Sequence, residues 1–264
     1  MTDYYPKRIV CLTEETTEML YILGEEDRIV GISGFTVRPP RARKEKPKVS
    51  QFTSANIDEI LELKPDLVLG FSDLQADIAA ELIRKGLNVH IFNQRSIHEI
   101  FGMILTLGAM VGQQDQAKQW VHKIEEKIAS IKQQALTRKG KPKVYFEEWN
   151  DPMISGIQWV SELIEIAGGE ECFPELSHQN LAKNRIIANP LDVVKRNPDI
   201  IIGSWCGKKF RPDQVVNRDG WENVPAVKKG QLFEIKSANI LQPGPAALTD
   251  GLDQIKDIID NWHA

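Results

Sequence analysis

Two aliphatic segments of the chain follow a proline in the same way. Residues 67–70 read Leu-Val-Leu-Gly after Lys64-Pro65-Asp66, and residues 200–203 read Ile-Ile-Ile-Gly after Asn197-Pro198-Asp199. Neither run alternates apolar and polar residues, which is typical of a strand buried on both faces of a parallel sheet. Helically spaced apolar residues precede each proline, and proline cannot continue a helix. The pattern therefore predicts one unit twice: helix, Pro-Asp break, buried strand.

The repeat extends beyond these segments. A predicted helix that stops at Gly24 has a counterpart that stops at Gly168, and the Lys85-Gly86 turn has a counterpart in Lys229-Gly230. Three matches in the same order indicate two homologous halves. We therefore expect two similar α/β lobes, with a small-molecule ligand in a cleft between them.

The remaining pattern gives the expected organisation. Ser96 and Glu99 form a capping box, after which residues 96–137 are predicted to be helical, with a clean amphipathic stretch at 116–134. The fold class is α/β, with two Rossmann-like lobes of parallel strands joined by one long α-helix. The predicted parts are an N-terminal lobe at 1–112, a linking helix at 113–138 and a C-terminal lobe at 139–264. Strands are expected at 8–12, 28–32, 67–70, 89–92, 143–146, 199–203 and 232–235.

Composition narrows the partners. The chain has 264 residues, a net charge of -4 and a pI near 5.8, which argues against a nucleic-acid-binding protein. Basic clusters at 38–48 and 208–211 leave a small anionic ligand possible, and the first is expected to be a solvated loop. The three cysteines form no disulfide framework, and Cys11 is expected to be buried. No transmembrane segment or signal peptide is recognisable in the sequence. Either the protein is made without export, or its sequence starts after a leader that has been removed.

Aromatic side chains follow the predicted strands, where turn residues are more usual. Their flat faces suit a large planar or macrocyclic ligand, although any one of them could equally cap a lobe core. Met153 lies close to them in sequence. The aromatic candidates are Phe35, Phe52 and Phe71 in the first half and Trp149 and Trp205 in the second.

The segment 205–212 combines an aromatic ring, a thiol and three cations. Lys208, Lys209 and Arg211 could meet carboxylates or phosphates of a ligand, although each lysine alone is better explained as a solvated loop residue. Cys206 could ligate a soft metal, but a lone cysteine more often packs.

The acidic and histidine residues form no catalytic set. Glu147 and Glu148 are adjacent on a strand and point to opposite faces, so they are not a catalytic pair. Glu14, Glu15 and Glu18 suit the positive end of a helix dipole. Among the five histidines, His178 is the only cleft candidate. With no nucleophile motif and no phosphate loop, an enzyme is not favoured.

The sequence resembles the helical-backbone (class III) substrate-binding proteins of ABC importers, which serve cobalamin, haem and ferric siderophores. The segment 57–68 is the most specific motif, the segments 8–12 and 16–20 resemble the start of the family, and 163–169 with 193–202 resemble the second lobe. Cobalamin-binding members are the most similar. The resemblance implies a corrinoid or related metal chelate as ligand, no intrinsic cofactor, a permease partner, a monomer, and a periplasmic or cell-surface location.

The resemblance also implies roles for individual residues. Ligand contact is carried over to Phe35, Phe52 and Phe71, and less directly to Trp149, Met153 and Trp205; the familiar cobalamin binders tend to have Tyr or Trp at the three Phe positions. Acidic docking residues for the permease are Asp77 or Glu81 and Asp213. The alternatives are a cytosolic corrinoid or tetrapyrrole binder, if Met1 is the native start, and a chelatase-like enzyme acting through His178, Glu147 or Glu148.

Overall fold

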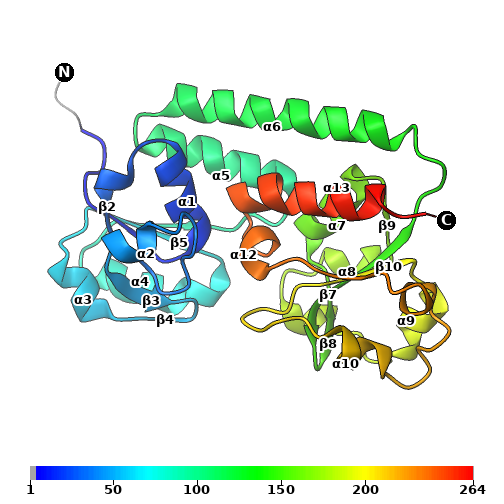
Figure 1. Cartoon of the computed structure of the whole chain (residues 1–264). Coiled ribbons are helices and arrows are strands. Elements are labelled where there is room, and N and C mark those ends of the chain that lie inside the picture. Colours follow the sequence, from blue (N-terminus) through cyan, green and yellow to red (C-terminus); the bar gives the residue numbers. More distant parts are fainter. Residues whose placement is uncertain (1–3, 264) are drawn as a thin grey trace. The chain divides into compact units, whose positions relative to one another are not determined.

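The computed structural model describes residues 4–263, and the chain divides into two compact units, one ending at Lys123 and the other beginning at Ile124. Each unit is an α/β lobe with its own sheet, and the boundary lies inside the long helix α6 (Gln114–Ala135) (Figure 1). The predicted fold class is confirmed. The finer boundaries at 112 and 139 stay a prediction.

The N-terminal lobe is built on a six-stranded sheet in the order β4-β3-β2-β1-β5-β6. The strands are parallel except for β4, which pairs antiparallel with β3. Buried aliphatic side chains from both faces of the sheet and from the helices that cover it make the core, including Val10, Ile60, Val68 and Leu82. The strands are β1 (Ile9–Cys11), β2 (Ile29–Ser33), β3 (Lys48–Gln51), β4 (Ser54–Ala55), β5 (Leu67–Phe71) and β6 (Val89–Phe92).

Short helices connect these strands, and two of the strands were not predicted. The pair β3 and β4 was missed because both strands are short and mostly polar, and β4 forms the edge of the sheet. The helices of this lobe are α1 (Glu14–Ile22), η1 (Glu26–Arg28), α2 (Ala42–Glu45), α3 (Ile57–Glu62), η2 (Asp73–Gln75), α4 (Ala76–Arg84) and α5 (Ile97–Met110).

The segment 96–137, which was predicted to be helical, forms two helices. The capping box is present, with Ser96 Oγ accepting from the Glu99 N–H and the Glu99 carboxylate accepting from the Ser96 N–H. However, α5 ends at Met110 and α6 begins at Gln114. Gly112 between them has φ 77°, a left-handed conformation that stops the first helix.

The C-terminal lobe is built on a five-stranded sheet in the order β11-β10-β7-β8, with β9 pairing with β7. The strand β7 (Lys143–Asn150) is longer than expected and folds back into the antiparallel strand β8 (Met153–Ser155). The predicted end at 146 is wrong because the aliphatic run stops there while the backbone pairing continues. The other strands are β9 (Glu170–Glu171), β10 (Ile200–Gly203) and β11 (Leu232–Glu234).

Several α-helices, a short 3-10 helix and a π-helical segment complete this lobe. Its core joins aromatic and aliphatic side chains, among them Tyr145, Phe173, Val193 and Trp221. The helices are α7 (Gln158–Ile166), α8 (Pro174–Ser177), η3 (Ala182–Arg185), α9 (Leu191–Arg196), α10 (Pro212–Val216), α11 (Pro225–Lys228), α12 (Ser237–Ile240), the π-helix η4 (Ala247–Gly251) and α13 (Leu252–Asp260).

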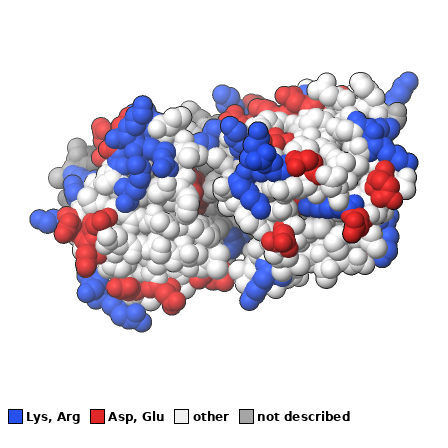
Figure 2. Space-filling view, turned by 60° about the horizontal axis from the view of Figure 1, so that its bottom comes forward, with Lys and Arg blue, Asp and Glu red and all other residues white. Residues whose placement is uncertain are grey.

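The surface charge is mixed. Figure 2 shows one face, on which Lys and Arg side chains are interspersed with Asp and Glu and separated by uncharged areas. On that face no continuous basic stripe runs over the described residues of either lobe. Such a stripe would be the electrostatic mark of a nucleic-acid-binding surface.

The sequence repeat is also a structural repeat. Lys64 and Asn197, which precede the two prolines, both take a left-handed backbone conformation, with φ 47° and 56°. The aspartate after each proline then reaches the start of the first strand of its lobe. Asp66 accepts hydrogen bonds from the Lys7 and Arg8 N–H groups at 2.7 and 2.9 Å. Asp199 accepts one from the Lys143 N–H at 2.9 Å.

We expect Asp199→Ala to lower the free energy of unfolding of the C-terminal lobe by about 1–2 kcal/mol, because a backbone N–H loses a charged acceptor. Urea titration followed by tryptophan fluorescence measures this. Asp257→Ala, an exposed carboxylate on α13, is the control and should have little effect. Equal effects of the two substitutions would contradict the prediction. The tryptophans that report on this lobe are Trp149, Trp159, Trp205, Trp221 and Trp262.

Candidate functional site

In the N-terminal lobe, the aromatic candidates lie beyond the carboxyl ends of the parallel strands, where such sheets bind ligands. Phe35 follows β2 and is 53% exposed. Phe71 ends β5, is buried, and has the Arg95 guanidinium 4.5 Å above its ring centroid. Phe52 is half-buried, with its ring centroid 6.5 Å from that of Phe71. The structure thus brings Phe52 and Phe71 together and leaves Phe35 with a free face.

A buried glutamine ties these loops to each other. Gln75 Oε1 accepts from the Phe71 N–H at 2.9 Å, and Gln75 Nε2 donates to the Phe52 carbonyl at 2.9 Å. Gln75 itself is fully buried. The positions of the two phenylalanines are therefore fixed by the backbone and are not free to rearrange independently.

Three carboxylates at the start of α1 are buried, which the helix-dipole interpretation did not anticipate. Glu14 and Glu18 are each 8% exposed and Glu15 is 1% exposed. Burial, with smaller contributions from Glu14 and Glu18, raises the pKa of Glu15 to about 8, although Thr13 Oγ1 donates to it at 2.7 Å. Burial also raises the pKa of Glu14, whose Oε2 has no hydrogen-bond partner.

The basic cluster at 38–48 is more ordered than the solvated loop expected there. Arg38 Nε donates to Glu18 at 2.8 Å, and Arg43 donates to the carbonyls of Gly34 and Thr36. The segment also contains the helix α2. These arginines therefore hold the loop that carries Phe35.

In the C-terminal lobe, Trp149 lies inside β7 and not after the strand as expected. Its Nε1 donates to the Asp151 carbonyl at 2.8 Å across the β7–β8 turn. Met153 begins β8 and is buried in the lobe core. The ring of Trp149 packs against that core and stays half-buried.

Trp205 is a core residue and is 3% exposed. Its ring meets Phe210 edge to face with centroids 5.0 Å apart. The Lys208 ammonium lies 4.1 Å from the Trp149 ring centroid and 5.1 Å from that of Trp205. The segment therefore presents Lys208 against two indole rings. Its charged and thiol candidates are all exposed: Cys206, Lys208, Lys209 and Arg211.

Glu147 is wholly buried and is held by three partners. The Arg218 guanidinium donates to both carboxylate oxygens, at 2.6 and 2.9 Å. Tyr145 Oη and Trp205 Nε1 donate at 2.9 and 3.0 Å. Burial alone would lower the pKa of Arg218, but the hydrogen bonds and charge of Glu147 outweigh it and raise that pKa. Glu147 is therefore the fixed counter-ion of Arg218.

Glu148 points to the opposite side of the strand, as predicted, and pairs with a different arginine. Arg185 is 2% exposed and donates to both oxygens of Glu148, at 2.6 and 3.1 Å. It also bonds the Ser155 carbonyl, while Ser155 Oγ donates to the Arg185 carbonyl. With both carboxylates committed to guanidinium groups, neither is available as a proton acceptor in a chelatase-like reaction.

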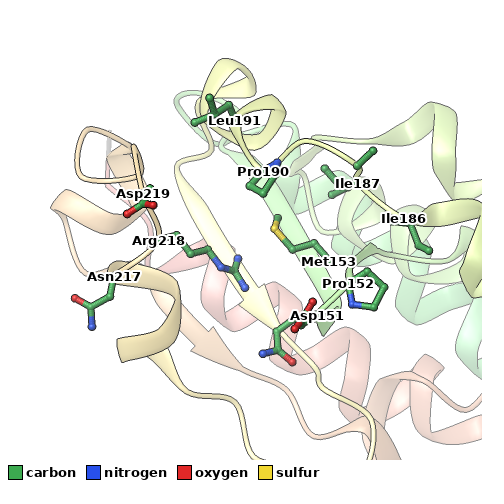
Figure 3. Close-up of a pocket in the computed structure, with 12 residues that line it drawn as sticks. Asp151, Pro152, Met153, Ile186, Ile187, Pro190, Leu191, Asn217, Arg218 and Asp219 are labelled. Carbon is green, nitrogen blue, oxygen red and sulfur yellow. The ribbon is translucent and has the colours of Figure 1, made fainter.

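A pocket of about 670 Å³ opens at the carboxyl end of β7 (Figure 3). Figure 3 shows the Arg218 guanidinium extending toward Met153 and Asp151, with the Met153 side chain directed toward Pro190. Three segments supply the lining: Asn150–Met153, Ile186–Leu191 without Asn189, and Asn217–Asp219. Met153 is the one lining residue that was also predicted from the sequence as a ligand contact.

The remaining candidates lie on the surface. Asp77 and Glu81 are exposed on α4, Asp213 is exposed in the first turn of α10, and His178 is exposed at the end of α8. Cys11 is buried as predicted, and burial raises the pKa of its thiol to about 12. Within residues 4–263 no group of three or more His, Cys, Asp and Glu side chains is arranged to hold a metal ion.

The family model for periplasmic binding proteins matches residues 9–238. This chain belongs to the periplasmic binding protein family. It is 27% identical over 263 residues to an uncharacterized ABC transporter substrate-binding lipoprotein, YvrC, of Bacillus subtilis, covering 96% of this chain and 80% of the relative. It is 24% identical to the cobalamin-binding protein of Halobacterium salinarum, covering 92% and 67% of the two chains.

A solved structure confirms the fold of this periplasmic binding protein. The apo haem-binding protein RhuT of Roseiflexus sp. RS-1 superimposes with a TM-score of 0.80 at 22% identity, covering 96% of this chain and 99% of that one. The family holds its ligand as transported cargo, so this protein is a substrate-binding protein and not an enzyme. In the described part of the chain, no helix has the length and apolar character needed to cross a bilayer.

The pocket of this periplasmic binding protein could not be found from local patterns. Arg185 and Arg218 lie 37 and 71 residues from the carboxylates that they pair with. One signal was available: two adjacent carboxylates at the end of a buried strand need cationic partners, because buried charges are rarely left unpaired. The adjacent carboxylates indicate that cationic partners exist, but they do not indicate which arginines these are.

We expect Glu147→Gln to lower the free energy of unfolding of the C-terminal lobe by about 3–5 kcal/mol, because it leaves the half-buried Arg218 without its counter-ion. Urea titration followed by tryptophan fluorescence is the measurement. As a control, Asp192→Asn breaks an exposed pair with Lys195 and should cost no more than about 1 kcal/mol. If Glu147→Gln lowers the free energy of unfolding no more than Asp192→Asn does, the buried pair is not needed for the stability of the lobe.

Glu15 should make the stability of the folded protein depend on pH. In the unfolded chain Glu15 ionises near its ordinary pKa of about 4.3, whereas the folded protein holds its proton up to a pKa of about 8. Its contribution to stability is full below the unfolded pKa, falls as pH rises toward 8 and changes no further above it. We expect Glu15→Gln to remove this slope and to stabilise the protein at pH 8 relative to the wild type.

Thermal unfolding followed by circular dichroism between pH 5 and 9 tests this, with the exposed Glu62→Gln as the matched control. An unchanged pH slope in Glu15→Gln would show that Glu15 is ionised in the folded protein.

Proposed function

We propose that this periplasmic binding protein binds a corrinoid of the cobalamin type outside the cytoplasm and delivers it to an ABC importer. The observation that carries the proposal is the set of ring faces at the carboxyl ends of the strands, with Phe35 exposed and Phe52 and Trp149 half-buried. Rings in such positions suit a large macrocycle. The cobalamin-binding relative from Halobacterium salinarum supports the same ligand class.

The chemistry of these positions favours a corrinoid over haem. Haem iron is held in proteins by His, Cys, Met or Tyr side chains. The N-lobe candidates Phe35, Phe52 and Phe71 carry no atom that can ligate iron. A cobalamin brings a lower axial ligand on its own nucleotide arm and needs none from the protein. Haem with the exposed Cys206 as ligand is the second candidate, and RhuT, which binds haem, has the same fold.

Delivery requires a contact with the permease. Asp77 and Glu81 on α4 and Asp213 on α10 are exposed carboxylates, one group on each lobe. We assign them to docking against basic residues of the permease, and we assign the protein to the monomeric state. Salt should weaken such a contact, because exposed charges are screened.

Tryptophan-fluorescence titration with cyanocobalamin, dicyanocobinamide, haemin and a ferric catecholate tests the ligand. We expect saturable quenching by the corrinoids and a loss of about 1–3 kcal/mol of binding free energy in Phe35→Ala, in line with an aromatic ring that covers a ligand. Leu136→Ala, which removes an exposed apolar side chain that is 78% accessible, is the control and should bind normally.

Each alternative outcome has its own meaning. Tighter binding of haemin, with a thiolate-type absorbance spectrum lost in Cys206→Ser, would replace the corrinoid by haem. Binding of the ferric catecholate alone would assign a siderophore. Quenching by none of the four would overturn the proposed ligand class.

A further inference from the structure

We infer that the pocket at the carboxyl end of β7 is a subsite for a primary carboxamide of the ligand and that it rejects a carboxylate. The inference rests on the proposed function, because corrinoids carry carboxamide arms around an apolar ring. It concerns the pocket formed within the C-terminal lobe by residues 150–153, 186–191 and 217–219.

The walls of the pocket are fixed by two ion pairs from adjacent residues of one strand. Glu147 holds Arg218, which belongs to the wall at 217–219. Glu148 holds Arg185, whose backbone leads directly into the wall at 186–191. A β-bridge between Ile154 and Ile186 adds a second tie to that wall. Since both pairs are bidentate, the separation of the walls is set by the β7 backbone and not by mobile loops.

The polar groups of the pocket are mostly acceptors. Asp151 and Asp219 are exposed carboxylates in its lining, and Asn150 Oδ1 is buried without a hydrogen-bond partner. Arg218 also lines the pocket, but its charge is balanced by the buried Glu147. Counting these side chains, Glu147, Asp151 and Asp219 carry three negative charges against one positive charge on Arg218.

This arrangement matches an amide better than any charged group. A carboxylate would be repelled by the two aspartates, and like charges placed together cost several kcal/mol. An ammonium group would be attracted by the two aspartates, but it would also be repelled by Arg218 and, having donors only, could not accept a hydrogen bond from the Arg218 guanidinium. A primary carboxamide offers a carbonyl to Arg218 and two N–H donors to the carboxylates and Asn150 Oδ1.

The apolar side of the pocket accepts the stem of such an arm. Met153 and Ile187 are buried beside Pro190, and the Met153 side chain points toward that proline (Figure 3). A methylene chain of two or three carbons can pack on these side chains while its amide reaches the polar rim. The volume of about 670 Å³ is ample for such an arm.

The test compares amide and acid forms of the same corrinoid. Mild hydrolysis of cyanocobalamin gives separable monocarboxylic acids in which one peripheral carboxamide has become a carboxylate. We expect at least one of these acids to bind the wild-type protein about 10-fold or more weakly than cyanocobalamin at pH 7.5, because like charges then meet in the pocket. Isothermal titration calorimetry gives the dissociation constants.

The variant Asp151→Asn/Asp219→Asn removes the two carboxylates. It should narrow the difference in dissociation constant between the acid and cyanocobalamin to about 3-fold or less. Asp257→Asn, which removes an exposed carboxylate of the same lobe outside the pocket, is the matched control and should leave the difference unchanged. Circular dichroism and an unaltered melting temperature verify that the double variant is folded; should it fail, each single variant is tested in its place.

The results separate this inference from the proposed function. Wild-type protein that binds cyanocobalamin and all its monocarboxylic acids equally overturns the carboxamide subsite alone. So does a difference that persists in the double variant, or one that narrows as much in Asp257→Asn. Wild-type protein that binds no corrinoid overturns the proposed function and the subsite together.

Discussion

Each lobe depends on one repeated interaction, the aspartate that follows a proline and binds the start of the first strand. Asp66 accepts from the backbone at Lys7 and Arg8, and Asp199 accepts from the backbone at Lys143. Parallel strands have no tight turn to set their register, so a side chain that joins two of them at their amino ends determines where the carboxyl ends fall. The loops beyond those ends carry the aromatic candidates and the pocket. The duplicated Pro-Asp unit is therefore a positional constraint on the binding surface as well as a break between helix and strand.

A second constraint acts only in the C-terminal lobe. A strand directs successive side chains to opposite faces, so Glu147 and Glu148 cannot share a partner. The protein resolves this with one buried guanidinium on each side, Arg218 and Arg185. Buried ion pairs contribute little net stability compared with apolar packing, because desolvation offsets their attraction. These pairs contribute geometry, because they fix two chain segments at defined positions on either side of β7.

Local signals in the sequence were enough for the fold and for part of the site. The proline breaks, aliphatic runs and glycine stops are all encoded within a few residues, which is why both lobes and their order could be predicted. Phe35 and Phe71 also lie at the ends of strands that the aliphatic runs predicted, β2 and β5. The errors came from contacts that are distant in sequence: β8 could not be recognised without its pairing to β7, and the burial of Trp205 follows from Glu147 and Phe210. The three buried glutamates of α1 were missed because the first turn of a helix is usually solvated.

The two lobes contribute different chemistry to recognition. The N-terminal lobe offers ring faces whose backbone positions are held by Gln75. The C-terminal lobe offers Trp149 with a cation upon it and a pocket rich in acceptors. A ligand of the proposed class needs a broad apolar face, neutral polar arms and little net negative charge, because carboxylate arms would be repelled by Asp151 and Asp219. Metal chelates with carboxamide arms meet all three conditions, whereas chelates with carboxylate arms meet only the first and place their charge where the protein already has its own. Under the proposed function, selectivity therefore depends on the peripheral groups of the chelate as much as on its ring.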